Sequence, residues 1–113
     1  MQGLPLTDAT HYFASDVGQS ADSDASVTLA AETGGRRVVD RIDCSYSGTP
    51  EDGLLRISDG VQDDWEVDFT NGGAGTFNSA GRPIYIGTEG QAVTVTHEAG
   101  GAAVVGKLNV HYR

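Results

Sequence analysis

Apolar and polar residues alternate with a period of two along most of the chain from residue 26 onward. In the segment 64–70, Trp65, Val67 and Phe69 share one parity, and Glu66 and Asp68 share the other. Successive side chains of a strand point to opposite faces of a sheet, so this pattern is typical of a half-buried strand. No useful length of the sequence keeps the period of an amphipathic helix. Strands are therefore predicted at 26–31, 36–47, 54–58, 64–70, 83–87, 91–98 and 104–112.

The longest alternation, at 36–47, predicts which of its side chains face the core. The predicted inward residues are Val38, Ile42, Cys44 and Tyr46, and the outward ones are Val39, Arg41, Asp43 and Ser45. Val93, Val95 and His97 share one face of the segment 91–98, and in the last segment Leu108, Val110 and Tyr112 do the same. A face of this kind packs against a second layer.

Turn signals separate the predicted strands. The chain has 16 glycines, several of them paired at strand boundaries, as in Gly34-Gly35 and Gly100-Gly101. The segment 71–82, NGGAGTFNSAGR, is predicted to be a long glycine-rich connection with Phe77 as its large apolar anchor. Gly106 lies inside a predicted strand, where a bulge or a close backbone approach is the usual reason. The expected fold is all-β, an antiparallel β-sandwich or jelly roll of about seven to eight short strands.

Residues 1–25 differ from the rest because aspartates, serines and glycines interrupt every period. We expect an extended N-terminal arm at 1–25 and a β-sandwich domain at 26–113. The large apolar groups of the arm could dock on the domain or on a neighbouring subunit. The residues predicted to contact a partner, on the arm and around the glycine-rich connection, are Leu4, Leu6, Tyr12, Phe13, Phe77 and Arg82.

Charge narrows the range of partners. Seven basic against 16 acidic residues give a net charge of −9. Nucleic acids and anionic membranes are bound through basic patches, so neither is an expected partner. The start of the chain lacks the basic and apolar regions of a signal peptide, and no apolar run is long enough for a membrane span, so a soluble, unexported chain is predicted. The single cysteine, Cys44, is expected to be a buried thiol.

The sequence shows no evident set of catalytic or metal-binding residues. The sequence lacks the nucleophile-elbow, zinc-protease and phosphate-loop motifs, so we expect neither an enzyme nor a cofactor. His97 and His111 would become neighbours if the last two strands paired. Acidic pairs or triplets at 22/24, 51/52 and 59/63/64 are read as solvated turns, although Asp59, Asp63 and Asp64 would be the set to test for calcium.

The aromatic residues have two interpretations. A sugar-binding protein could use them as a stacking platform; the set is Tyr46, Trp65, Phe69, Phe77, Tyr85 and Tyr112. Trp65 and Phe69 share the parity of Val67, which favours core packing for both. Tyr12 and Phe13 are better candidates for an interaction, because their segment has no core of its own.

Three runs carry a resemblance to a known group of proteins. SYSGTPEDGLLRISDG, WEVDFTNGGAG and EAGGAAVVGKLNVHYR resemble small β-rich proteins encoded in the structural gene regions of tailed bacteriophages and prophages. The likeness covers roughly residues 26–113. It implies a non-enzymatic virion component, a head decoration or cement protein on the outer surface of the major capsid protein lattice, made in the host cytoplasm and homo-oligomeric on the particle. The alternative is a tail- or fibre-associated β-sandwich module that binds a host receptor or a carbohydrate.

Overall fold

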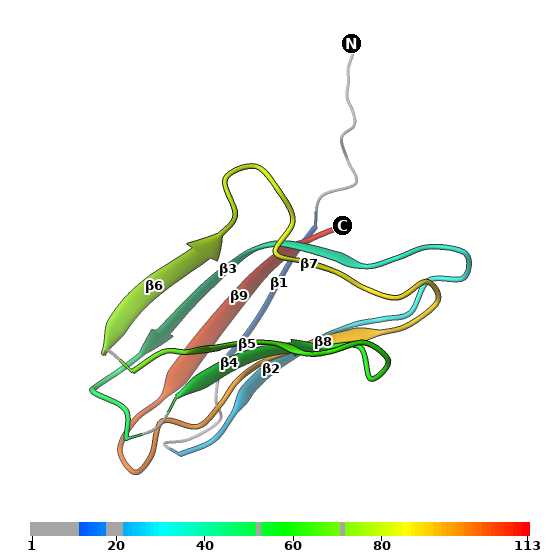
Figure 1. Ribbon diagram of the computed structural model, residues 1–113. Coiled ribbons are helices and arrows are strands. Elements are labelled where there is room, and N and C mark those ends of the chain that lie inside the picture. Colours follow the sequence, from blue (N-terminus) through cyan, green and yellow to red (C-terminus); the bar gives the residue numbers. More distant parts are fainter. Residues whose placement is uncertain (1–11, 18–21, 52, 71) are drawn as a thin grey trace.

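The computed structural model describes residues 12–17, 22–51, 53–70 and 72–113, and these form two antiparallel sheets packed as a β-sandwich (Figure 1). The nine strands are β1 (Tyr12–Val17), β2 (Ala25–Leu29), β3 (Val38–Tyr46), β4 (Leu54–Ser58), β5 (Trp65–Asp68), β6 (Gly73–Asn78), β7 (Tyr85–Ile86), β8 (Val93–His97) and β9 (Gly106–Tyr112). One sheet has the order β1-β9-β3-β6, with β7 also paired to β3, and the other has the order β2-β8-β4-β5. The all-β sandwich predicted from the alternation is confirmed.

The core lies between the sheets and is built from the predicted alternating positions. β2, β4 and β8 bury every second residue, and the sheet that contains β3 and β9 does the same from the other side. The fully buried larger side chains are Val39, Ile42, Leu55, Ile57, Val93, Val95, His97, Leu108 and Val110. Burying apolar side chains of this size stabilises a fold by about 1.5–3 kcal/mol each. Packing between the two sheets is therefore the main source of stability.

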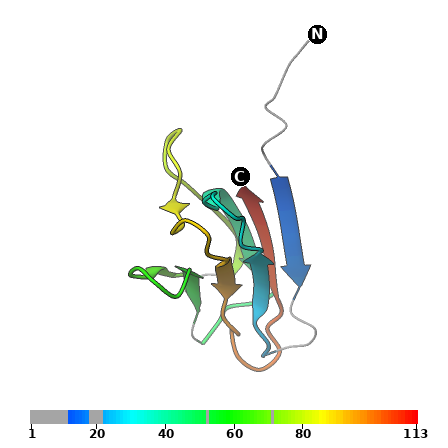
Figure 2. The ribbon, with the colours of Figure 1, turned by 90° about the vertical axis from the view of Figure 1, so that its right-hand side faces the viewer.

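Part of the segment expected to be an arm is a strand. β1 pairs antiparallel with β9, with Tyr12 opposite Tyr112 and Val17 opposite Lys107 (Figure 2). Ala14 is partly buried against the core. These six residues thus dock on the domain, one of the two alternatives that the sequence left open. Leu4 and Leu6 lie outside the described residues.

The glycine-rich connection also contains a strand that the alternation did not predict. β6 pairs with β3 along six residues, with Phe77 opposite Ile42 and Gly75 opposite Cys44. A Cβ added at Gly75 would lie 2.8 Å from the Phe69 ring, so only glycine allows this ring to lie so close to the strand. Since three of the six β6 residues have side chains no larger than a methyl group, the segment carries little hydrophobic alternation.

A β-bulge in β3 changes the phase of the predicted alternation. The register between β3 and β9 shifts between Val39 and Arg41, which leaves Asp40 as the extra residue. Val39 is consequently fully buried and Val38 is only half-buried, so the prediction of Val38 inward and Val39 outward is wrong. The inward positions from Ile42 to Tyr46 are confirmed.

Residues of two of the three sequence runs quoted above, SYSGTPEDGLLRISDG and EAGGAAVVGKLNVHYR, meet around one side chain, Tyr46. A Cβ at Gly53 would lie 2.9 Å from its ring, and one at Gly100 would lie 3.0 Å from it. A Cβ at Gly106 would lie 3.4 Å from the Tyr46 ring and 3.0 Å from that of His97, so the close approach expected at Gly106 is present. The Tyr46 hydroxyl donates to the carbonyl of Glu98. These runs therefore encode the packing of one end of the sandwich.

Candidate functional site

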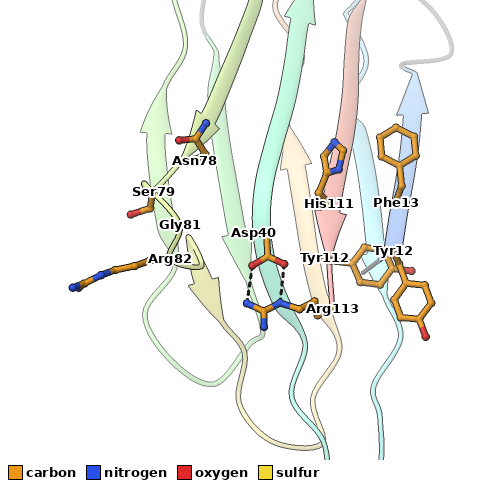
Figure 3. A pocket seen from close by; sticks show the side chains of 10 residues that line it. All are labelled: Tyr12, Phe13, Asp40, Asn78, Ser79, Gly81, Arg82, His111, Tyr112 and Arg113. Atoms are coloured by element: carbon orange, nitrogen blue, oxygen red, sulfur yellow. Dashed lines mark hydrogen bonds and ion pairs between the residues drawn. The ribbon is translucent and has the colours of Figure 1, made fainter. Parts of the chain in front are cut away.

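A groove of about 610 Å³ lies at the other end of β3, where β1 begins and β9 ends. Its lining comes from β1, β3, the end of β6, the following turn and the C-terminus (Figure 3). The lining residues are Tyr12, Phe13, Asp40, Asn78, Ser79, Gly81, Arg82, His111, Tyr112 and Arg113. A groove of this volume is within the range of small-ligand and side-chain pockets.

The bulge of β3 supplies the centre of the groove. Asp40, the extra residue, accepts two hydrogen bonds of 2.9 Å from Nε and Nη2 of Arg113. Figure 3 shows this pair between the aromatic side chains and the turn that carries Arg82. The hydrogen bond with Asp40 raises the pKa of the Arg113 guanidinium. A fixed ion pair of this kind presents acceptor and donor atoms side by side.

Aromatic rings form one side of the groove. The Phe13 ring is 59% exposed and lies edge-on to the His111 ring, with 4.8 Å between centroids. The rings of Tyr12 and Tyr112 lie 5.4 Å apart, and the Tyr12 side chain is 51% exposed. Arg37 places its guanidinium carbon 5.7 Å from the centre of the Tyr112 ring. Large exposed rings held by neighbours lose little conformational entropy when they bind a partner.

A hydrogen-bonded cluster extends from the groove along the outer face of the same sheet. Asp43 accepts from Arg41 Nε at 3.1 Å and from Thr76 Oγ1 at 2.8 Å, and its other oxygen lies 3.4 Å from His111 Nε2. Partial burial raises the pKa of Asp43, but the hydrogen bonds from Arg41 and Thr76 outweigh this and lower it below the ordinary value. The carboxylate form thus holds β3, β6 and β9 together on the face that leads to Phe13.

The structure brings together three of the six predicted contact residues. Tyr12, Phe13 and Arg82 line the groove, although 69 residues separate Phe13 from Arg82 in the sequence. Phe77 does not line it: this ring faces inward, 6.0 Å from the Phe69 ring and 6.2 Å from the Trp65 ring. The groove gathers predicted residues from the two segments of the chain that were expected to contact a partner.

Sequence reasoning did not predict the roles of Asp40, Asn78, His111 and Arg113. Asp40 carried a usable signal, since an aspartate between Val38-Val39 and Ile42 interrupts an otherwise apolar strand. The other three enter the groove through the register of β3 with β6 and β9, which no local pattern encodes.

His97 and His111, which would be neighbours if the last two strands paired, lie in different sheets. β8 pairs with β2 and β4, whereas β9 pairs with β1 and β3, so this condition is not met. His97 is fully buried, stacks on Tyr46 with 4.0 Å between centroids, and donates from Nε2 to the Ser45 carbonyl. Burial lowers the pKa of His97. His111, in contrast, lies in the groove.

Asp59 is neither a solvated turn residue nor an open cation ligand. Its carboxylate is buried and accepts hydrogen bonds from the main chain of Val61, Gln62 and Thr88 and from the side chains of Gln62 and Thr88. Burial raises the pKa of Asp59, but the hydrogen bonds, led by that from the Thr88 hydroxyl, lower it far below the ordinary value. Through these hydrogen bonds, Asp59 connects the turn after β4 to the segment after β7.

Other reactive groups are also enclosed. Burial, with a contribution from the charge of Asp43, raises the pKa of Cys44 to about 12, and burial raises that of Tyr46 to about 12. Within the described part of the chain, no three His, Cys, Asp or Glu side chains are grouped so that they could hold a metal ion. The same residues include no helix long and apolar enough to cross a membrane.

Comparison with known proteins finds likeness in the strand arrangement alone. No protein-family model and no curated protein matches the chain. The carbohydrate-binding module TmCBM61, solved with β-1,4-galactotriose, has a TM-score of 0.45 and 13% identity over 92% of this chain and 86% of that one. A ruminal GH26 endo-β-1,4-mannanase has a TM-score of 0.42 and 10% identity, over 80% of this chain but 18% of the mannanase chain.

A virus particle structure is similar at a lower level. The extra small virus of the giant freshwater prawn Macrobrachium rosenbergii has a TM-score of 0.32 and 12% identity, over 96% of this chain and 82% of that chain.

Proposed function

We propose that this protein is a non-enzymatic decoration protein of a tailed-phage head, which binds the outer surface of the capsid lattice through the groove end of the sandwich. The observation that carries the proposal is the meeting of Tyr12, Phe13 and Arg82 in one groove. Exposed aromatic rings beside an arginine are the residue types that dominate protein–protein contacts. The phage-like runs support the choice of partner, while the groove supports the choice of surface.

The two ends of the sandwich differ in how many side chains they expose, and this difference favours a binding role for the groove end. The Tyr46 end is closed by ring packing and by the hydrogen bond to Glu98. The groove end presents exposed rings, the Asp40–Arg113 pair and the exposed Arg82 side chain. On a capsid, identical sites repeat in fixed geometry, so modest contacts at each protein become durable if copies are linked to one another.

Copy number tests the proposed function. Virions of the phage or prophage that encodes the chain are purified, and the protein is quantified against the major capsid protein by mass spectrometry. A decoration protein is expected at a fixed ratio to the capsid protein and in hundreds of copies. A few copies per particle, or recovery with isolated tails, would overturn the proposal.

Carbohydrate binding is the second candidate, and one observation favours it. The groove places an aromatic wall, Phe13 and Tyr12, beside the paired polar groups of Asp40 and Arg113. Sugar rings stack on aromatic faces while their hydroxyls bond to charged and amide side chains. A glycan array with the full chain tests this candidate: specific binding that Phe13→Ala abolishes would support it, and no binding to any glycan would count against it.

A further inference from the structure

A second pocket lies where β5 of one sheet and β7 of the other sheet begin. Its volume is about 460 Å³, and it is lined by residues 62–65, which lead into β5, and by residues 83–86, which lead into β7. It shares no described lining residue with the groove. The two walls come from segments that are about 20 residues apart in the sequence. This pocket is therefore a separate candidate site.

Hydrogen bonds and ring packing hold the walls of this pocket in place. The side-chain nitrogen Nε2 of Gln62 donates to the main-chain carbonyl of Ile86 at 2.8 Å and to Asp59 Oδ2 at 3.0 Å. Trp65, on the same wall as Gln62, is partly buried and lies edge-on to the Phe77 ring, with 6.2 Å between centroids. Walls fixed in this way lose little conformational freedom when a ligand binds.

Two carboxylates that line the pocket have no basic neighbour. Asp63 and Asp64 are both exposed, and neither takes part in an ion pair among the residues that the structure describes. Five of the 16 acidic residues lie within 59–68, a segment that contains no lysine or arginine. Like charges this close repel one another, so a cation at the pocket would relieve the repulsion.

A buried hydroxyl without a hydrogen bond also belongs to this pocket. Tyr85 is the one lining residue that is buried, with 7% of its surface exposed. Its hydroxyl lies near Asp59 and Gln62 but makes no hydrogen bond of ordinary geometry to any described residue. Buried hydroxyls in folded proteins usually have a partner. A donor group that enters the pocket beside Gln62 would supply one.

We propose that this pocket binds an arginine or lysine side chain of a partner protein. The charged group lies at Asp63 and Asp64, and the aliphatic stem packs on Trp65. Basic side chains bury their methylene stems on apolar surfaces and are attracted to the face of an indole ring. The net charge of −9 draws a basic partner toward the chain, whereas it repels a second copy. Because the pocket lies outside the groove, the inference does not rest on a capsid partner.

Fluorescence of Trp65 tests the inference directly, because Trp65 is the one tryptophan of the chain. The full chain is titrated with the acetylated, amidated tripeptide Leu-Arg-Leu and, separately, with Leu-citrulline-Leu, which has nearly the same shape without the charge. We expect a saturable change in emission with the arginine peptide and binding at least about fivefold weaker with the citrulline peptide. Amide NMR shifts should accompany binding at residues 62–65 and 83–86.

A pair of double variants separates the pocket from net charge. Asp63→Asn combined with Asp64→Asn should weaken binding of the arginine peptide about fivefold or more. The matched control combines Glu51→Gln with Asp68→Asn, which removes the same charge from exposed residues outside the pocket. This control should leave the dissociation constant within about twofold of the wild-type value.

The opposite results would overturn the inference. These are the absence of a saturable response to the arginine peptide, equal binding of the two peptides, or equal weakening by the two double variants. Spermidine that binds as tightly as the arginine peptide would make a free polyamine the ligand and contradict a partner protein. If the double variant at Asp63 and Asp64 is less stable to urea, Trp65→Leu, followed by NMR, is the second variant and should also weaken binding. None of these results bears on the groove.

Discussion

The hydroxyl of Tyr46 donates a hydrogen bond to the main-chain carbonyl of Glu98, 52 residues further along the chain. This bond ties the last residue of β3 to the residue that follows β8, and so it joins the two sheets. Gly53, Gly100 and Gly106 leave the space that the ring occupies. Packing around Tyr46 thus closes one end of the sandwich, whereas the groove lies at the opposite end of β3.

Gly100→Ala should lower the free energy of unfolding by about 1–3 kcal/mol, the usual cost of overpacking. The added methyl group would lie 2.8 Å from a Val104 methyl and 3.0 Å from the Tyr46 ring. Gly48→Ala is the matched control, because a Cβ there meets nothing within 4 Å. Urea unfolding of both variants measures the difference, and equal stability would show that the packing around Tyr46 is loose.

Asp59→Asn should destabilise the fold by about 1–3 kcal/mol, because several buried donors lose a carboxylate acceptor. Asp63→Asn is the control, since Asp63 is exposed. Thermal unfolding measures both. Addition of Ca²⁺ should leave the melting temperature unchanged, because the Asp59 oxygens are already engaged; a rise with Ca²⁺ that Asp59→Asn removes would contradict this structural role.

Acid should weaken the fold through His97 before the carboxylates titrate. The folded-state pKa of His97 lies below its unfolded value, so the unfolded chain binds the proton more tightly. The contribution of His97 to the free energy of unfolding is fully present above about pH 6.5, which is its pKa in the unfolded chain. This contribution is lost as the pH falls from that value toward the lower pKa of His97 in the folded protein. The slope should not exceed about 1.4 kcal/mol per pH unit.

Urea unfolding at a series of pH values between about 6.5 and 4.5 measures this slope, in a range above the ordinary pKa of the aspartates. His97→Phe, which keeps an aromatic ring beside Tyr46, should reduce the slope. If the free energy of unfolding changes equally with pH in the wild type and in His97→Phe, groups other than His97 cause the loss of stability in acid.

β1 contributes to stability as well as to the groove. A truncation that starts at Ser26 removes the hydrogen-bonded partner of β9, so it should unfold at a lower urea concentration than a truncation that starts at Tyr12. The difference between the urea midpoints of the two truncations measures the contribution of residues 12–25 to stability. Identical midpoints would show that β1 adds nothing to the sandwich. A binding test of the arm therefore needs the truncation that retains β1.

Sequence patterns predicted most of the fold because strand alternation is a local property. Every predicted strand overlaps a strand of the structure, and Val93, Val95 and His97 of β8 and Leu108 and Val110 of β9 lie on the inward faces, as expected. β6 was missed because glycines carry no hydrophobic signal, and β1 because its large residues, Tyr12 and Phe13, are adjacent rather than alternating.

The candidate site was only partly predictable. Tyr12, Phe13 and Arg82 stood out as large or charged residues in segments without an evident core of their own. Their meeting with Asp40 and His111 depends on one bulge and on the register of three strands, which long-range pairing determines. Phe77 stood out for the same reason as Phe13, but it faces inward because it lies opposite Ile42 in β3.

Rebinding to stripped heads tests the central claim most directly. Phage heads freed of the protein are mixed with wild-type chain, Phe13→Ala, Arg82→Ala or the control Ile86→Ala, and the bound fraction is measured by sedimentation. Ile86 is 52% exposed, close to the 59% of Phe13, but lies in β7 outside the groove. We predict that Phe13→Ala and Arg82→Ala each weaken attachment about tenfold or more while Ile86→Ala binds as wild type. Undiminished attachment of both groove variants, each shown to be folded, would contradict the claim that the groove holds the capsid.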